Sequence, residues 1–488
     1  MGERTYQGCT VILSILLVIT SSIGFWSIVN PQVEYIIIAE EQSLDCVYPP
    51  PDVDLPEMHL EIRELIFDNL ASDVNGVLLL NGGFVTNRYD TDVEQVFRQE
   101  SNFLYVTGYD QPNATVILDT ASRKTILFIE NHPEDYAVWN GNIESPAQIS
   151  DEYLISEVYF REEIPSILAS LQSSNPTDFT VYVMDKFVEF PSMSDYTVDT
   201  TYLEELIYGR REVKTDSELM LMRYAASVSS GAHEIVMNHT RPGTYEYNVE
   251  GTFLDGCFAC GLTIQAYIPI CASGNNSAIL HYVANDRLMQ NGDFLLIDAG
   301  AEYNGYGTDI TRTYPVNGTF TADQAEVYQM VLDIQYRVIQ RVAPGLSWGA
   351  LQGYAEEYTC EMLINNDYIY SSVSDCLSLR LFRYFFPHGV SHYIGLDVHD
   401  RSDNFSIQLN ERNVITVEPG IYFNAALLEP ILDDPQLRTY FNSEKIQSLL
   451  DIEFGGVRIE DVVIVWSTGP EVISFPPKTI FAIDNQMN

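Results

Sequence analysis

Short apolar runs separated by polar loops dominate the first half of the chain. Four runs have the length and the β-branched or aromatic content of strands: Val77 to Leu80, Asn102 to Tyr109 (NFLYVTGY), Thr115 to Asp119 and Lys124 to Glu130. Apolar residues follow helical spacing in three others: His59 to Leu70, Pro165 to Ser173 and Leu203 to Tyr208. This alternation predicts an α/β domain over residues 57–211.

A second domain is expected after Gly209-Arg210-Arg211. Thr215 or Asp216 can cap a long helix that runs to about Met237, with Glu218 in its first turn. The remainder, residues 212–488, also mixes helical and strand patterns. The predicted fold class is therefore α/β (α+β), with two domains.

The amino terminus carries a long uncharged segment. Residues 10–29 contain no charged side chain, and Val11 to Ile19 has the length of a signal-peptide core. Arg4 precedes this segment and no Lys or Arg follows it until Arg63, which favours translocation of the rest of the chain. We therefore expect residues 1–29 to be a cleaved signal peptide or an uncleaved membrane anchor, and the protein to be secreted or in the endomembrane lumen. A buried helix of a cytosolic protein is the remaining alternative.

Residues 30–56 follow as a predicted spacer. Pro49 to Pro51 are consecutive prolines, and acidic residues lie beside them. Such a stretch favours an extended conformation without a packed core. Globular sequence is expected from about Glu57.

Charge restricts the classes of partner. Lys and Arg number 25 and Asp and Glu 69, which gives a formal net charge of −44. So negative a surface repels phosphate backbones, and nucleic-acid binding is excluded. Solubility alone would account for the excess, although it also suits bound metals.

The seven cysteines are sparse and odd in number, and they predict no disulfide framework. Cys257 and Cys260 have C-x-x-C spacing within a helix-like stretch. No second pair lies at zinc-ribbon distance, so we expect two buried thiols.

Two acids flank the strongest hairpin signal in the chain. Asn304-Gly305 separates two β-type runs, and a two-residue turn would place Asp298 opposite Thr311. Asp309 would then share a sheet face with Asp298, roughly 7–8 Å away at Cα. Two exposed hairpin acids are the alternative, but Asp298 follows four apolar residues, where an unpaired acid would be costly.

Three histidines, His388, His392 and His399, lie within twelve residues of a chain that has eight histidines in total. One alone is usually structural, whereas three together favour a site. Glu418 and Glu460 resemble Asp298 in lying within or at the end of an apolar strand pattern.

Four carboxylates gathered with one imidazole would repel one another unless cations neutralised them. Two divalent ions supply +4 against −4. Oxygen-rich ligation with a single imidazole suits Mn(II), with Zn(II) or Co(II) as alternatives. Arg458 shares a strand face with Glu460, where an ordinary surface ion pair is the alternative.

These segments resemble the prolidase/aminopeptidase P family of metallopeptidases. IDAGAEYNGYGTDITRTYPVNG, HGVSHYIGLDVHD, TVEPGIYF and GGVRIED carry the resemblance, which extends over residues 57–488. NRYDTDVEQVFRQES and the acidic insert 424–453 are more similar to prolidases. The resemblance implies a creatinase-like first domain, a pita-bread second domain, a homodimer and hydrolysis of Xaa-Pro bonds in dipeptides or short peptides.

The resemblance also implies a role for each residue. Asp298 would bind one metal, Asp309 and Glu460 would bridge two, and His392 and Glu418 would hold the second. The implied catalytic residues are His281, His388, His399 and Glu418. The implied substrate-binding residues are Tyr267 and Arg458.

One departure leaves the substrate class open. Only fifteen residues separate Asp400 from Thr416, where prolidases carry a longer loop with an arginine that binds the substrate carboxylate. Arg401 or Arg412 would have to substitute. The expected activity is that of an Xaa-Pro dipeptidase; the alternatives are aminopeptidase P, which acts on longer peptides, and a non-catalytic relative that binds proline-containing peptides.

Overall fold

The structure is a computed structural model that describes residues 46–184, 195–400 and 408–488. The predicted leader, the first part of the predicted spacer and Arg401 lie outside these residues. Within the described ranges, no helix has both the length and the apolar character needed to cross a bilayer.

The N-terminal lobe is built on a six-stranded sheet with the order β4-β3-β2-β1-β5-β6. Strands β1, β2 and β3 pair antiparallel, and the outer pairings are parallel. The strands are β1 (Gly76–Asn81), β2 (Thr115–Asp119), β3 (Lys124–Ile129), β4 (Glu157–Phe160), β5 (Thr180–Val183) and β6 (Thr197–Asp199). The helices are α1 (Leu55–Asp68), α2 (Ser101–Thr107), α3 (Tyr136–Asn140), α4 (Pro146–Glu152), α5 (Ile164–Ser174) and α6 (Tyr202–Glu212).

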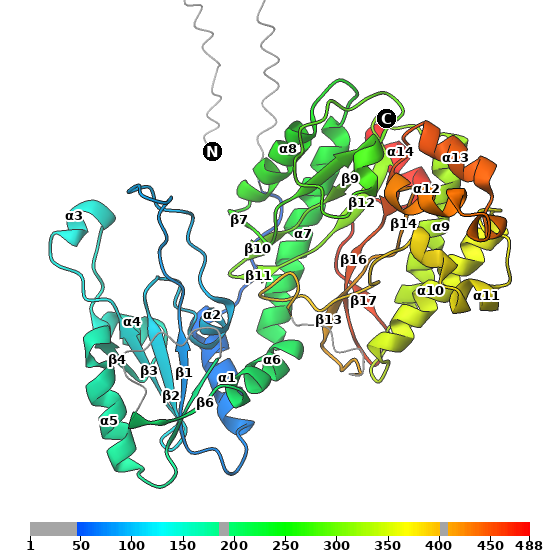
Figure 1. Ribbon diagram of the computed structural model, residues 1–488. Coiled ribbons are helices and arrows are strands. Elements are labelled where there is room, and N and C mark those ends of the chain that lie inside the picture. The colour runs from blue at the N-terminus through cyan, green and yellow to red at the C-terminus, as the bar shows by residue number, and fades with distance from the viewer. Residues whose placement is uncertain (1–45, 185–194, 401–407) are drawn as a thin grey trace, which may run out of the picture. The chain divides into compact units, whose positions relative to one another are not determined.

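Strand β1 is apolar throughout because both of its faces are covered. Leu78 and Leu80 pack in the cluster that contains α1 and α2, whereas Val77 and Leu79 pack with α5. Figure 1 shows α1 and α5 on opposite sides of this sheet. The strands predicted at β1, β2 and β3 and the helices predicted at α5 and α6 are confirmed.

The NFLYVTGY run is a helix, and its prediction as a strand was wrong. The Glu100 carboxylate accepts a hydrogen bond from the Phe103 backbone N–H at 2.7 Å and caps α2. Gly108 ends the helix in the left-handed region with φ +70°. Phe103 and Val106 are buried one turn apart, so the run satisfies helical as well as alternating periodicity.

The helix predicted over His59 to Leu70 is confirmed as α1, which begins at Leu55, four residues earlier than the apolar spacing indicated. The Asp54 side chain accepts from the Glu57 N–H at 3.2 Å, and Pro56 occupies the first turn, where its missing N–H costs nothing. Residues 46–54 form neither helix nor strand.

The C-terminal lobe places small sheets between two helix pairs. Its sheets have the orders β12-β9-β8, β11-β10-β7, β13-β16-β17 and β14-β15. In Figure 1, α7 and α8 lie on one side of β9, β12 and β16, and α9 and α10 lie on the other. The helices are α7 (Asp216–His239), α8 (Glu246–Phe258), α9 (Ala322–Ile339), α10 (Trp348–Asn365), α11 (Val373–Ser378), α12 (Ala425–Asp433), α13 (Ser443–Asp451) and α14 (Ile480–Met487). The strands are β7 (Ile264–Gln265), β8 (Ile270–Ser273), β9 (Phe294–Asp298), β10 (Ala301–Tyr303), β11 (Tyr306–Gly307), β12 (Thr311–Pro315), β13 (Val414–Val417), β14 (Gly420–Tyr422), β15 (Gly456–Arg458), β16 (Asp461–Ile464) and β17 (Glu471–Val472).

Two local predictions in this lobe are confirmed. Thr215 caps α7 and forms a reciprocal capping box with Glu218. In the hairpin, Tyr303 pairs with Tyr306 and Asp298 lies opposite Thr311. Asn304 and Gly305 have φ angles of +48° and +83°, as a tight two-residue hairpin turn requires.

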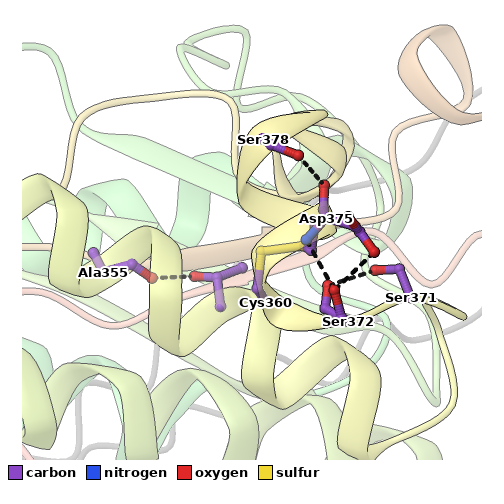
Figure 2. Close-up of a disulfide and its surroundings, with 8 residues drawn as sticks. Ala355, Cys360, Ser371, Ser372, Asp375 and Ser378 are labelled. Atoms are coloured by element: carbon purple, nitrogen blue, oxygen red, sulfur yellow. Dashed lines mark hydrogen bonds between the residues drawn. A yellow bond between two sulfur atoms is a disulfide. The ribbon is translucent and has the colours of Figure 1, made fainter.

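The prediction of no disulfides was wrong. Cys46 bonds to Cys260 and Cys360 bonds to Cys376, the second linking α10 to α11 in Figure 2. Of the C-x-x-C pair, only Cys257 is a buried thiol as expected. Cys46 and Cys260 are separated by 214 positions, so their pairing depends on tertiary contacts that spacing does not encode.

Candidate metal centre

All five predicted metal ligands converge on one cavity of about 490 Å³. Asp298 ends β9, and Asp309 lies in the turn that leads into β12. His392 lies in the loop before β13, Glu418 directly follows β13, and Glu460 lies between β15 and β16. Four of the five ligands thus come from strand ends or the turns beside them, where side chains of separate sheets can meet.

His392 is the centre of the tightest cluster. Its Nε2 lies 3.5 Å from Asp309 Oδ2, 3.4 Å from Glu418 Oε1 and 4.0 Å from Glu460 Oε1. Ligand atoms of Asp309, His392 and Glu460 all lie within 4.8 Å of one another. His392 Nδ1 lies 3.0 Å from the Tyr393 carbonyl oxygen, and donation there leaves Nε2 with a lone pair directed at the acids.

Asp298 is held by two side chains. Its Oδ2 accepts from Arg458 Nη2 at 2.5 Å, and its Oδ1 lies 2.6 Å from the Tyr267 hydroxyl. The same hydroxyl lies 2.6 Å from Asp309 Oδ1. A hydroxyl has one proton to donate, so it cannot fully satisfy both carboxylates.

Glu460 has one paired and one unpaired oxygen. Oε2 accepts from the Thr311 hydroxyl at 2.6 Å, and Thr311 in turn accepts from Arg458 Nε at 3.2 Å. Oε1 is buried and has no hydrogen-bond partner. A buried carboxylate oxygen without a partner is costly in a native protein, and it points to a bound cation as the missing partner.

The acids of the centre have few compensating charges. Burial raises the pKa of Asp298 to about 6, against the opposing Arg458 charge, and burial raises the pKa of Glu418 to about 7. Burial and the neighbouring Asp309 raise the pKa of Glu460 well above its ordinary range. The donor set of carboxylate oxygens and one imidazole fits divalent Mn, Zn or Co.

The sequence model of metallopeptidase family M24 matches residues 220–467, which include all five of these residues. The chain belongs to metallopeptidase family M24. A second model, the N-terminal domain of aminopeptidase P, matches residues 59–182.

The known proteins similar to this chain include Xaa-Pro dipeptidases and aminopeptidases. It is 36% identical over 450 residues to an Xaa-Pro dipeptidase from Pongo abelii, with 86% of this chain and 90% of the relative covered. Its structure resembles the Pseudomonas aeruginosa aminopeptidase PepP with a TM-score of 0.77 and 28% identity, covering 88% and 98% of the two chains. A zinc-substituted E. coli aminopeptidase P in complex with product gives a TM-score of 0.76 and 26% identity, covering 90% and 99%. The predicted two-domain fold is confirmed.

The three predicted catalytic histidines also reach the M24 cavity. His281, His388 and His399 contribute to its wall, and the His399 ring packs edge-on against His392 with centroids 4.5 Å apart. His388 Nε2 lies 2.8 Å from the Tyr422 hydroxyl. Burial and the nearby Arg458 charge lower the pKa of His388 to about 3, so this imidazole is neutral at pH 7.

The two predicted substrate-binding residues contact the metal centre directly. Tyr267 bonds to Asp298 and Asp309 as described, and it is not among the residues that form the cavity wall. Arg458 is on the wall, but its guanidinium is occupied by Asp298, Thr311 and Tyr422. It is not a surface pair with Glu460.

Arg412 does not reach the cavity. Its Nε donates to the Lys214 carbonyl oxygen at 2.6 Å, and its guanidinium pairs with Asp216. It therefore cannot substitute for the carboxylate-binding arginine of prolidases in this conformation.

Sequence reasoning missed Thr311 and Tyr422. Thr311 was placed opposite Asp298 in the predicted hairpin, so the register already put its hydroxyl beside the acids. Tyr422 lies in the GIYF motif and joins His388 to Arg458 through its hydroxyl. Its role depends on the fold of β14 against β15 and has no signal in spacing.

Proposed function

We propose that the chain hydrolyses Xaa-Pro peptide bonds with two divalent metal ions, as an Xaa-Pro dipeptidase. The observation that carries this proposal is the convergence of four carboxylates and one imidazole on a cavity whose wall holds three further histidines. The dipeptidase relative supports the substrate class, because identity of 36% extends over 90% of that protein.

The proposed ligand roles follow from which atoms face each other. Asp309 shares the Tyr267 hydroxyl with Asp298 through Oδ1 and faces His392 Nε2 through Oδ2, so it lies between the two halves of the centre. We assign Asp309 and Glu460 to bridge two ions, Asp298 to one ion, and His392 and Glu418 to the other. Mn(II) is the proposed metal.

Divalent ions held by these five residues would supply Lewis-acid chemistry, which lowers the pKa of a bound water and polarises a carbonyl. Glu418 is half-buried at the cavity and lies 3.9 Å from His388 Nδ1 through Oε2. There it can move a proton from the attacking water to the leaving proline nitrogen. His281 and His399 line the cavity and would donate to the oxyanion that forms when the carbonyl is attacked.

The alternative is aminopeptidase P activity on longer peptides. The solved structures with this fold favour it, since the matched proteins are aminopeptidases. A dipeptidase should cleave Gly-Pro and leave Gly-Pro-Xaa peptides intact, whereas an aminopeptidase P should cleave the longer peptides. Paired assays of both substrates, with metal analysis of the same sample, separate the two.

Chelation tests the metal requirement itself. Exhaustive removal of divalent ions should abolish hydrolysis, and Mn(II) should restore it. Full activity after chelation would overturn the proposal. A non-catalytic relative would bind proline-containing peptides without cleaving them, and the presence of all five ligand residues argues against it.

We also propose that the protein is a homodimer. We further propose that it is secreted or luminal, and that its leader is either cleaved or retained as a membrane anchor. The two disulfides support an oxidising compartment, because cytosolic thiols are kept reduced. Expression with mass analysis of the amino terminus tests cleavage, and light scattering tests the oligomeric state. Purified protein with all its thiols reduced would count against the proposed compartment.

A further inference from the structure

We propose that Glu246 is a positioning residue that holds the segment carrying His281 at the cavity wall. The inference rests on the proposed role of His281 in catalysis. Glu246 opens α8, where acids are usually exposed and interact with the helix dipole. Here its side chain is fully buried, and it reaches across to residues 273–287.

One oxygen of Glu246 organises the beginning of this segment. Oε1 accepts from the Ser273 backbone N–H at 2.6 Å and from the Ser273 hydroxyl at 2.7 Å. It also accepts from Asn276 Nδ2 at 3.3 Å. These donors fix the end of β8 and the turn of η4 (Gly274–Ala278) that follows it.

The other oxygen organises the end of the segment. Oε2 accepts from the Tyr282 hydroxyl at 2.7 Å and from the Arg287 backbone N–H at 2.9 Å. The Glu246 N–H in turn donates to the Arg287 carbonyl oxygen at 3.0 Å. Glu246 thus holds the segment at both ends, and Tyr282 is the immediate neighbour of His281.

The intervening residues have a second anchor. The side chains of Leu280 and Tyr282 pack against the apolar cluster of Ile270, Leu296 and Tyr422. His281 itself is exposed on the cavity wall, and within the part of the chain that the structure describes neither its backbone nor its ring makes a hydrogen bond. Its position therefore depends on its neighbours. The nearest polar constraint is the Tyr282 hydroxyl, which lies 2.7 Å from Glu246 Oε2 and, at the longer distance of 3.2 Å, from Asp286 Oδ1.

A double-mutant cycle between Tyr282→Phe and His281→Ala tests this inference on the full chain. The phenyl ring keeps the packing and removes only the hydroxyl. We expect Tyr282→Phe to lower kcat and kcat/KM about tenfold with unchanged metal content. The reason is that the His281 imidazole would no longer be held where it can donate to the oxyanion of the transition state. In the His281→Ala background the same change should alter kcat less than about twofold.

Two outcomes overturn the proposals separately. If His281→Ala leaves kcat unchanged, the proposed catalytic role of His281 fails. If His281→Ala lowers kcat but Tyr282→Phe costs the same factor in both backgrounds, or nothing in the wild type, the positioning role of Glu246 fails.

A second variant and a control complete the design. Glu246→Gln keeps the shape but presents an amide N–H₂ to donors, so its effect on kcat should exceed that of Tyr282→Phe and should also vanish in the His281→Ala background. Tyr247→Phe is the control, because Tyr247 lies on the same helix, is 50% exposed and stacks on Tyr245 outside this network. It should leave kcat unchanged.

Discussion

Two buried acids that are adjacent in the chain, Glu460 at the metal centre and Asp461 beside it, have opposite surroundings. Asp461 follows the proposed ligand Glu460 directly and is equally inaccessible to solvent. Its oxygens accept from Arg312 Nη2 at 2.7 Å and from the Lys478 ammonium, with Gln335 and Ser474 as further donors. Burial alone would raise the pKa of Asp461, but the Arg312 and Lys478 charges lower it below its ordinary range.

The two positions differ in their direct partners: the Asp461 carboxylate bonds to Arg312 and Lys478, whereas the Glu460 carboxylate bonds to no Lys or Arg side chain within the described residues. Glu460 keeps an unpaired buried oxygen and a raised pKa, whereas every oxygen of Asp461 is paired. The unpaired oxygen of Glu460 is therefore where a cation from solution would bind. Burial alone does not separate these two acids, whereas their direct partners do.

The largest expected effect is that of Glu460→Gln. Loss of the charge should remove bound metal and lower kcat by roughly a thousandfold, about 4 kcal/mol in the activation barrier. Metal content and kcat are measured on the same preparation. Glu429→Gln, the same change at an exposed position on α12, is the control. Full metal content in Glu460→Gln would refute the bridging assignment.

Asp461→Asn should act on stability instead. It leaves the buried Arg312 and the half-buried Lys478 without their counter-charge, which costs about 3 kcal/mol in the free energy of unfolding. Urea unfolding of the metal-loaded protein measures the loss, and added Mn(II) should not recover it. A variant as stable as the wild type would show that the ion pairs of Asp461 with Arg312 and Lys478 do not stabilise the fold.

The contribution of Asp400 to the stability of the fold should depend on pH. Burial alone would raise the pKa of Asp400, but the Arg211 and Lys214 charges lower it to about 2. Because the folded pKa lies below the unfolded value of about 3.9, the stabilisation is complete above about pH 5 and is lost as the pH falls toward 2, by about 2 kcal/mol. Unfolding of the wild type and Asp400→Asn from pH 6 to pH 2 should therefore converge at low pH. Parallel curves would contradict the assignment.

The smallest effect is expected for an exposed pair. Glu471 accepts from Arg223 Nε at 2.7 Å and Nη2 at 2.8 Å, but both side chains are more than a third exposed. Glu471→Gln should cost only about 0.5 kcal/mol in the free energy of unfolding, and added salt should reduce the difference. A loss as large as that of Asp461→Asn would mean that burial does not control the strength of these pairs.

Short sequence motifs predicted much of the fold and the residues that meet at the candidate site. The capping box of Thr215 and Glu218 and the register of Asp298 with Thr311 follow from contacts between near neighbours in the chain. Such contacts depend on backbone geometry that short motifs specify. The prediction of a strand for NFLYVTGY was wrong because its apolar pattern fits both helical and strand periodicity. The Glu100 cap favours the helix.

The amino-acid sequence by itself determined which acids and histidines are available to bind metal. An acid in a strongly apolar strand is costly to bury without a partner, so it is conspicuous before the position of the strand is known. Only the tertiary structure decided which of those acids lack a cation, as the contrast between Glu460 and Asp461 shows. It alone also paired Cys46 with Cys260 and brought Tyr282 to Glu246. The physical reason is that compensation of a buried charge and closure of a disulfide depend on distances of a few ångströms between segments far apart in the chain, and residue types and spacing do not encode those distances.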